Sequence, residues 1–118
     1  MSKLNALTAQ ESVERWLNFI DRHEYARSWS EAATYFQTNV ASEQWNKTLQ
    51  GVREPLGKTI TRQLKSKQYE TSLPGVADGE YVVIKYDTSF ELKKSALETV
   101  TLMLEPDFTW KVAGYFFK

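Results

Sequence analysis

Apolar residues in the first half of the chain recur at helical spacing. From Thr8 to Ile20 they fall every three or four positions, which predicts an amphipathic helix with one buried stripe. Thr8 and Glu11 have the spacing of a capping box. We therefore expect this helix to begin at Thr8 and to end near His23, whose solvated imidazole would lie where the helix dipole favours its charged form.

Two further helices are predicted before Gly57. Ser28 and Glu31 repeat the capping signal. The apolar face behind this signal comprises Trp29, Ala32, Ala33 and Phe36. The next helix begins at Ser42 and is stopped by Pro55, which lacks a backbone N–H. Gly57 suits the left-handed position that commonly follows a helix.

The second half of the chain alternates apolar and polar residues as strands do. The predicted strands are residues 58–69, 80–90, 95–105 and 108–117. The connections between them are short and rich in turn residues, which predicts an antiparallel meander. Helices followed by strands are typical of the α+β class. We expect one α+β domain, residues 1–118, with three N-terminal helices packed on one face of the four-stranded sheet.

Alternation assigns one face of this sheet to the helices. The residues predicted on it are Ile60, Leu64, Val82, Ile84, Tyr86, Thr88, Phe90, Ala96, Val100, Leu102, Leu104, Phe108, Trp110, Val112, Gly114 and Phe116. Arg62 and Glu98 fall on the same face, at positions where the period calls for apolar residues. A lone buried charge is costly. We expect either a mutual ion pair or a partly wet concavity with both residues in its wall.

The opposite face is less polar than a solvent-facing sheet surface usually is. Such a patch favours an interaction surface. We predict a homodimer whose contact face is formed by Tyr81, Val83, Thr99, Thr101, Met103, Tyr115 and Phe117. The alternative is that Thr, Tyr and Val are simply good strand formers. Lys65 and Lys67 are also expected on the face opposite Arg62, as solvated residues that protect a sheet edge.

Six aromatic residues come from all three predicted helices and from two strands. They are Trp16, Tyr25, Trp29, Trp45, Tyr86 and Trp110. Most of this set is expected to be core. Rigid rings on a curved sheet can also line a cavity, and buried indole and phenol groups need hydrogen-bond partners. An internal water or ligand is therefore one expectation.

Composition narrows the possible functions. The chain has 15 basic and 15 acidic side chains, so we expect no general attraction to nucleic acid or acidic membranes. It has no Cys and one His, which excludes disulfides, a Cys nucleophile and a multi-histidine metal site. No apolar run reaches the length of a membrane span, and no phosphate-binding or nucleophile-elbow motif is present. We predict no cofactor and no metal.

Several short segments together resemble an uncharacterised bacterial group, the domain-of-unknown-function family 4019. The matching segments are Ser28-Trp29 with Ala32-Ala33, Trp45, Val52-Arg53-Glu54-Pro55-Leu56-Gly57 with Arg62, Leu73-Pro74-Gly75, Asp78-Gly79-Glu80-Tyr81, Thr88-Ser89-Phe90, Glu98-Thr99-Val100 and Val112-Ala113-Gly114-Tyr115. The resemblance implies a cystatin-like or NTF2-like cone of helices against a curved antiparallel sheet. It implies a periplasmic or secreted protein if the chain is a mature fragment, and a cytoplasmic one if Met1 is the native start.

Three functions stay open on these observations. The first is a non-catalytic binding or interaction module whose aromatic cone holds a small apolar or carboxylate ligand or a peptide. Its candidate site residues are Arg62, Glu98, Arg53 and Trp29, with Arg62 supplying charge to a carboxylate. The second is a small lyase or isomerase with Glu98 as its base. The third is a structural homodimerisation domain.

Overall fold

The computed structural model describes residues 3–118, with side chains from residue 8 onward, and it has an α+β fold. Its helices are α1 (Lys3–Asp21), α2 (Tyr25–Ser30), α3 (Thr34–Asn39), α4 (Ser42–Val52) and the 3₁₀ turn η1 (Glu54–Leu56). Its strands are β1 (Thr59–Glu70), β2 (Tyr81–Phe90), β3 (Lys93–Leu104) and β4 (Trp110–Phe117). The predicted class is confirmed, with four α-helices in place of three.

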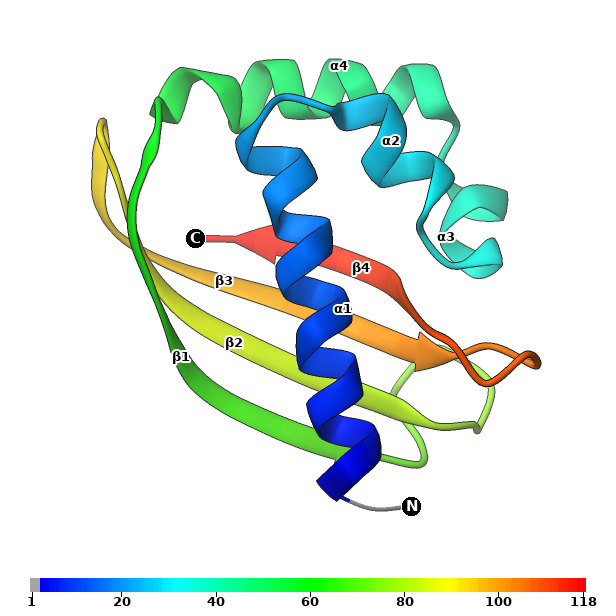
Figure 1. Cartoon of the computed structure of the whole chain (residues 1–118). Helices are drawn as coiled ribbons and strands as arrows, with labels where there is room; N and C mark the ends of the chain where they lie inside the picture. The colour runs from blue at the N-terminus through cyan, green and yellow to red at the C-terminus, as the bar shows by residue number, and fades with distance from the viewer. Residues whose placement is uncertain (1–2) are drawn as a thin grey trace.

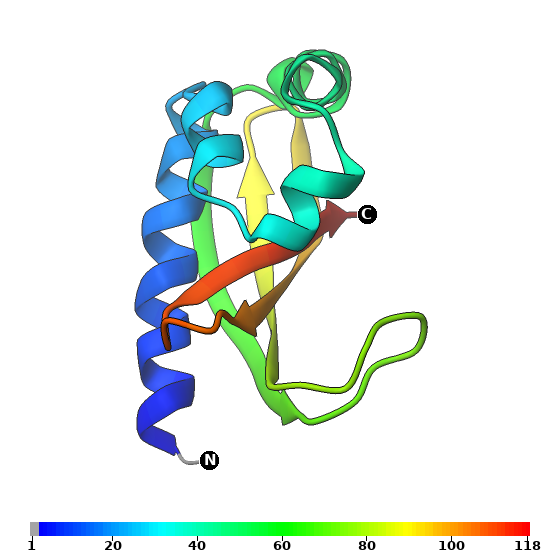
Figure 2. The ribbon, with the colours of Figure 1, turned by 90° about the vertical axis from the view of Figure 1, so that its right-hand side faces the viewer.

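The strands form one open sheet in the order β1-β2-β3-β4, each antiparallel to its neighbour. The predicted meander is therefore confirmed. Helix α1 lies across one face of this sheet, and α2, α3 and α4 gather at one end of it (Figure 1). We call the face toward α1 the inner face and the opposite one the outer face. The long loop between β1 and β2 projects on the outer side (Figure 2).

The core lies between α1 and the inner face of the two central strands. On β2 and β3, alternate residues are buried as predicted: Val82, Ile84, Tyr86, Thr88 and Phe90, then Ala96, Glu98, Val100 and Leu102. From α1, the stripe Ala9, Val13, Trp16, Leu17 and Ile20 meets them, also fully or nearly fully buried. Period-two and helical patterns therefore locate the core correctly where the sheet is regular.

Two predicted helix starts are wrong. Helix α1 begins at Lys3, so Thr8 and Glu11 lie inside it and do not form the expected capping box. Ser28 lies within α2, fully buried, and its hydroxyl donates to the carbonyl of Tyr25 at 2.6 Å. The local capping pattern is outweighed here by tertiary contacts, because Ser28 serves the core and not a helix end.

The ends of α1 and α4 are built largely as predicted. His23 follows α1 in the left-handed region, with φ of 61°, and the backbone N–H of Glu24 reaches the carbonyl of Phe19 at 2.8 Å. This is a Schellman-type end with His23 where glycine is more usual. Helix α4 starts at Ser42, Pro55 lies in η1, and Gly57 has φ of 78°.

A bulge in β4 reverses the faces of its second half. Leu102 pairs with Val112, and the next pair is Thr101 with Gly114, so Ala113 is an extra residue. Beyond it, the inner face carries Tyr115 and Phe117, while Phe116 points outward and is 58% exposed. The prediction that Tyr115 and Phe117 lie on the outer face is wrong, because one inserted residue shifts a period-two pattern by one. Gly114 and Phe116 are misplaced for the same reason.

Strand β1 is an edge strand with register shifts of its own. Between Leu64 and Ser66 the pairing slips by one residue, and the ammonium group of Lys67 donates to Gln10 Oε1 of α1 at 2.9 Å. Lys67 therefore lies on the inner side, contrary to prediction. Ile60 and Leu64, predicted as buried, are 56% and 42% exposed, because an edge strand with bulges is only partly covered by α1.

Two other structural points bear on function. Phe108, predicted on the inner face, precedes β4 in the β3–β4 turn and is 82% exposed. None of the helices in the described part of the chain is long and apolar enough to cross a membrane.

Candidate functional site

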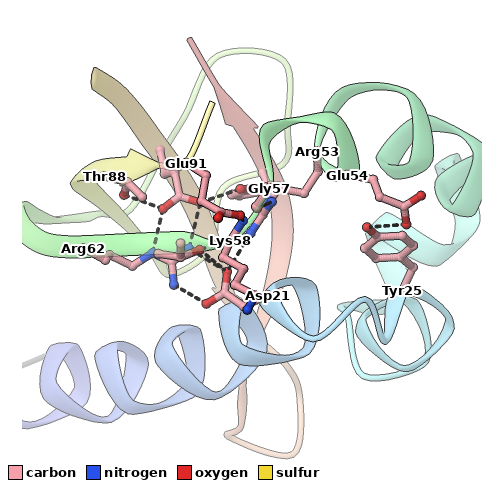
Figure 3. Close-up of polar contacts among 12 residues, drawn as sticks. Asp21, Tyr25, Arg53, Glu54, Gly57, Lys58, Arg62, Thr88 and Glu91 are labelled. Carbon is pink, nitrogen blue, oxygen red and sulfur yellow. Dashed lines mark hydrogen bonds and ion pairs between the residues drawn. The ribbon is translucent and has the colours of Figure 1, made fainter. Parts of the chain in front are cut away.

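The guanidinium of Arg62 in β1 is held between two carboxylates. Its Nε donates to Glu98 Oε1 at 2.7 Å, and Nη2 donates to Glu98 Oε2 at 3.2 Å. On its other side, Nη1 and Nη2 donate to the two oxygens of Asp21 at 2.7 and 3.0 Å (Figure 3). These bonds join the end of α1 to β1 and β3. We call this cluster, with the residues bonded to it, the polar network.

Glu98 is closed off from solvent by its partners. It is fully buried, and its oxygens also accept the hydroxyls of Thr88, at 2.6 Å, and Tyr115. A catalytic base must lie within hydrogen-bond reach of its substrate. Each carboxylate oxygen of Glu98 accepts two hydrogen bonds from side chains, and the residue has no exposed surface, so the geometry argues against Glu98 as a base. Four of the five N–H groups of Arg62 are likewise used, which argues against Arg62 as the binder of a ligand carboxylate.

Arg53 is a second buried cation in the polar network. Its Nη1 donates to the carbonyl of Gly57 at 2.6 Å, and its Nη2 donates to Thr59 Oγ1 at 3.1 Å (Figure 3). Asp21 Oδ1 lies 3.4 Å from the same Nη2. The guanidinium carbon lies 4.5 Å from the centre of the Phe90 ring, a cation–π contact. Arg53 thus fastens the α4–β1 connection to the end of α1.

The charges of the polar network balance. Two arginines face two carboxylates, Asp21 and Glu98. Burial alone would raise the pKa of Asp21, but the hydrogen bonds and positive charge of Arg62 outweigh it and lower that pKa. Burial and the neighbouring Glu98 carboxylate raise the pKa of the Tyr115 phenol well above its ordinary value. Over the neutral range, the Asp21 carboxyl therefore stays ionised and the Tyr115 phenol stays protonated.

Trp29 does not join the polar network. Its indole donates to the carbonyl of Val40 at 2.6 Å, which ties α2 to the segment after α3. The structure thus brings together three of the four predicted site residues, Arg62, Glu98 and Arg53, and leaves Trp29 in a separate corner.

The six aromatic residues serve mainly as core, although Trp16 and Trp110 also line a hollow of about 350 Å³ between α1 and β4. Trp16 and Trp45 both donate to Ser28, one to its carbonyl at 2.8 Å and one to its hydroxyl at 2.9 Å. Tyr25 donates to Glu54 and Tyr86 to Glu14. Five of the six predicted cavity-lining aromatics therefore find protein partners. An internal ligand is not needed to satisfy them.

The outer face carries an apolar hollow of about 350 Å³. Its floor is the outer face of β2, β3 and β4, including Tyr81, Met103 and Gly114. One wall is the β1–β2 loop, with Leu73, Pro74, Val76 and Ala77, and Tyr35 of α3 also lines it. The Tyr81 hydroxyl donates to the carbonyl of Ala77, which pins the loop over the sheet. None of the residues described as lining this hollow is charged.

Comparison with known proteins places this chain in a family. A family model described as "Protein of unknown function (DUF4019)" matches residues 12–115. The chain belongs to the DUF4019 family. A search of curated proteins finds no match. The match includes the polar network, from Asp21 to Tyr115, and the whole outer-face hollow.

Sequence reasoning missed four members of the polar network in this DUF4019 chain: Asp21, Thr59, Thr88 and Tyr115. A signal existed for Asp21, which lies four residues after Leu17 on the buried stripe of α1. The alternation pattern placed Thr88 on the correct face of the sheet but gave no sign that its hydroxyl would bond Glu98. Tyr115 was hidden by the β4 bulge, which no alternation pattern marks. Among the described residues, no group of three or more His, Asp or Glu side chains is arranged to hold a metal ion.

Proposed function

We propose that this DUF4019 protein is a non-catalytic binding module that takes an apolar ligand on the outer face of its sheet. The observation that carries the proposal is the contrast between the two faces. The inner face ends in the polar network, and a hollow of about 350 Å³ between α1 and β4 is lined by charged side chains, among them Glu11, Arg15 and Lys111. The hollow of about 350 Å³ on the outer face has an uncharged lining. Binding sites are typically concave, mostly apolar and of this size.

Small residues make room for the hollow. The β4 bulge places Ala113 and Gly114 at its edge, with Gly114 opposite Thr101. A β-carbon added at Gly114 would meet no other atom within 4 Å. A glycine in a strand often marks a bulge or a place where a ligand approaches the backbone. The bulge thus supports the proposal by leaving open space on the outer face.

The hollow suits a small apolar molecule or an apolar side chain of a peptide. Its floor and loop wall are aliphatic or aromatic, while Thr101, Tyr35 and Tyr81 add hydroxyl groups. Apolar area would supply most of the affinity, and the hydroxyls would orient a polar end.

Titration with the neutral apolar dye Nile red tests this proposal. We expect its fluorescence to rise on binding to the wild-type protein and to stay near the level of free dye with Gly114→Leu, which fills the hollow. Gly51→Leu is the matched control, because Gly51 lies exposed on α4 with nothing within 4 Å of an added β-carbon. Equal dye binding by wild type and Gly114→Leu would overturn the proposal, as would no binding to wild type.

A homodimer through the outer face is the second candidate. Five of the seven residues predicted for it lie on this face: Tyr81, Val83, Thr99, Thr101 and Met103. Phe116 joins them, exposed, after the bulge. Tyr81 and Thr99 are already nearly buried within one chain, which reduces what a second copy would cover. Light scattering after size-exclusion chromatography tests it: a dimer mass that Phe116→Asp reduces to a monomer supports this candidate, and a monomeric wild type contradicts it.

A further inference from the structure

We propose that the partner bound on the outer face is a peptide segment with an apolar side chain next to a lysine or arginine, and that Phe108 is its anchor. This inference rests on the proposed function, since it names the partner class for the same face. It starts from a second hollow that adjoins the first.

The second hollow, of about 380 Å³, continues the first toward the β3–β4 turn. The two share Ala77, Tyr81 and Met103 as lining residues. Together they form a groove whose lining includes Tyr35 in the first hollow and Phe108 in the second. An occupant of both hollows must be extended, as a peptide is when it places successive side chains in neighbouring pockets.

Phe108 is placed in a way that folding alone does not favour. Its ring is 82% exposed, and its φ is 66°. A bulky side chain rarely adopts this left-handed conformation, which glycine adopts freely. The turn is closed by bonds of 2.8 Å from Phe108 N to Glu105 O and from Glu105 N to Thr109 O. Phe108 holds the position where such hairpins usually have glycine.

An exposed aromatic ring on a strained residue gains little burial to offset the strain. Backbone strain of this kind concentrates at recognition sites, and aromatic side chains are common binding anchors. Because Phe108 lines the second hollow, its ring is available to cover an incoming side chain. These observations assign it a contact with the partner.

The charges along the groove select a basic partner. Asp78, Glu80 and Glu105 line the second hollow. Neither a lysine nor an arginine is among the described residues that line the two hollows. Lys111 lies beyond the turn, where it lines a third hollow together with Asp107; that hollow shares Glu105 and Pro106 with the second. An apolar floor with a carboxylate rim complements an apolar residue flanked by a cation.

Selection from a random peptide library displayed on phage, against the immobilised full-length protein, tests the inference. We expect enriched peptides to share a large apolar residue adjacent to Lys or Arg. For the most enriched peptide, we expect Phe108→Gly to raise the dissociation constant about tenfold or more, as loss of an aromatic anchor does. The same variant should keep or raise the thermal midpoint, because glycine relieves the left-handed strain.

Two further variants complete the design. Asp78→Lys should lower the affinity for the peptide several-fold and reduce the dependence of this affinity on salt concentration. Phe116→Ala removes an exposed aromatic on the same face but outside the groove, so it should leave peptide affinity unchanged.

Several results would overturn the inference. The first three are a selection that enriches no peptide, enriched peptides that lack basic residues, and a peptide affinity that Phe108→Gly leaves unchanged. The fourth is self-association of the wild-type protein that Phe108→Gly abolishes, which would assign the groove to a second copy of the chain. If Nile red binds wild type but not Gly114→Leu while no peptide is enriched, the proposed function stands and only this inference fails. If the wild-type protein does not bind Nile red, the proposed function fails as well.

Discussion

Arg62 shows how a charge can be kept inside this protein. Its guanidinium has two carboxylate partners, one from the end of α1 and one from β3. Buried ion pairs contribute little net stability, because desolvation offsets their attraction. Removing one partner is far more damaging, since it strands the other charge in the interior. The polar network is therefore a strong constraint on how α1 docks, although it adds little net stabilisation.

Glu98→Gln tests this asymmetry at constant side-chain shape. Loss of the Glu98 charge leaves two arginines facing one carboxylate, and we expect the free energy of unfolding to fall by about 3 kcal/mol. The matched control is Asp87→Asn, which removes the exposed 3.8 Å pair of Asp87 with Lys65 and should change stability by less than about 1 kcal/mol. Urea unfolding measures both. If both variants change the free energy of unfolding by a similar, small amount, the polar network does not constrain how α1 docks.

Asp21 gives the network an acid-sensitive contribution. Its pKa in the folded protein lies below the ordinary value of 3.8. The stability that Asp21 adds is therefore complete above that value and is lost as pH falls through the lower, folded pKa. We expect the stability difference between wild type and Asp21→Asn to shrink from about pH 6 to about pH 2. Denaturation curves across this range measure it, and a difference that grows on acidification would contradict the assignment.

At the residue scale, sequence could find Arg62 and Glu98 because each interrupts an apolar alternation. Asp21 gave a weaker signal, because a polar residue at the end of an amphipathic helix is also typical of solvent exposure. Arg53 was singled out only through the family resemblance. In the interior it contacts the Phe90 ring, a pairing across 37 residues that local patterns do not encode.

At the element scale, strand positions were predictable and strand faces only partly so. On β2 and β3 the alternation runs without interruption through Val82, Ile84, Val100 and Leu102, and all four are buried. On β1 and β4 a bulge moves every later residue to the other face. Tyr115 and Lys67 were misassigned for this reason. The bulges depend on how the edge strands pair, which a single-strand pattern does not contain.

The α4–β1 connection depends on one glycine. Gly57 has φ of 78° and ψ of −156°, a region that is essentially restricted to glycine. A β-carbon there would lie 2.6 Å from Glu91 Oε1, the oxygen that accepts the Lys58 backbone N–H at 2.7 Å (Figure 3). Conformation and space therefore both require glycine at this position.

We expect Gly57→Ala to lower the free energy of unfolding by about 1–3 kcal/mol. Gly51→Ala, on exposed α4 with open space around it, should instead raise it by about 0.5–1 kcal/mol through helix propensity. Chemical denaturation compares the pair. Equal effects of the two substitutions would mean that the turn at Gly57 can relax without cost.

At the scale of the whole molecule, the two faces of the sheet are built differently. The inner face is covered by α1, with the polar network at one end and a hollow with a charged lining between α1 and β4. The outer face is hollowed between the β1–β2 loop, α3 and the β3–β4 turn. The zero net charge conceals a local excess of carboxylates along this groove. Sequence predicted an interaction surface on the outer face, but placed the ligand site inside the cone. Our proposal places the site on the outer face instead, because the aromatic donors of the cone bond to protein groups far away in sequence, such as Ser28.

The most direct test of this account is to locate a bound apolar probe by methyl NMR. With hexan-1-ol as the probe, the account predicts concentration-dependent shifts of the methyl signals of Met103, Ala77 and Ala113, which line the outer hollow. The signals of Leu17, Ile20 and Val100, which are buried in the core, should stay in place. Shifts confined to the core methyls would show that the ligand enters the cone, and would contradict the account.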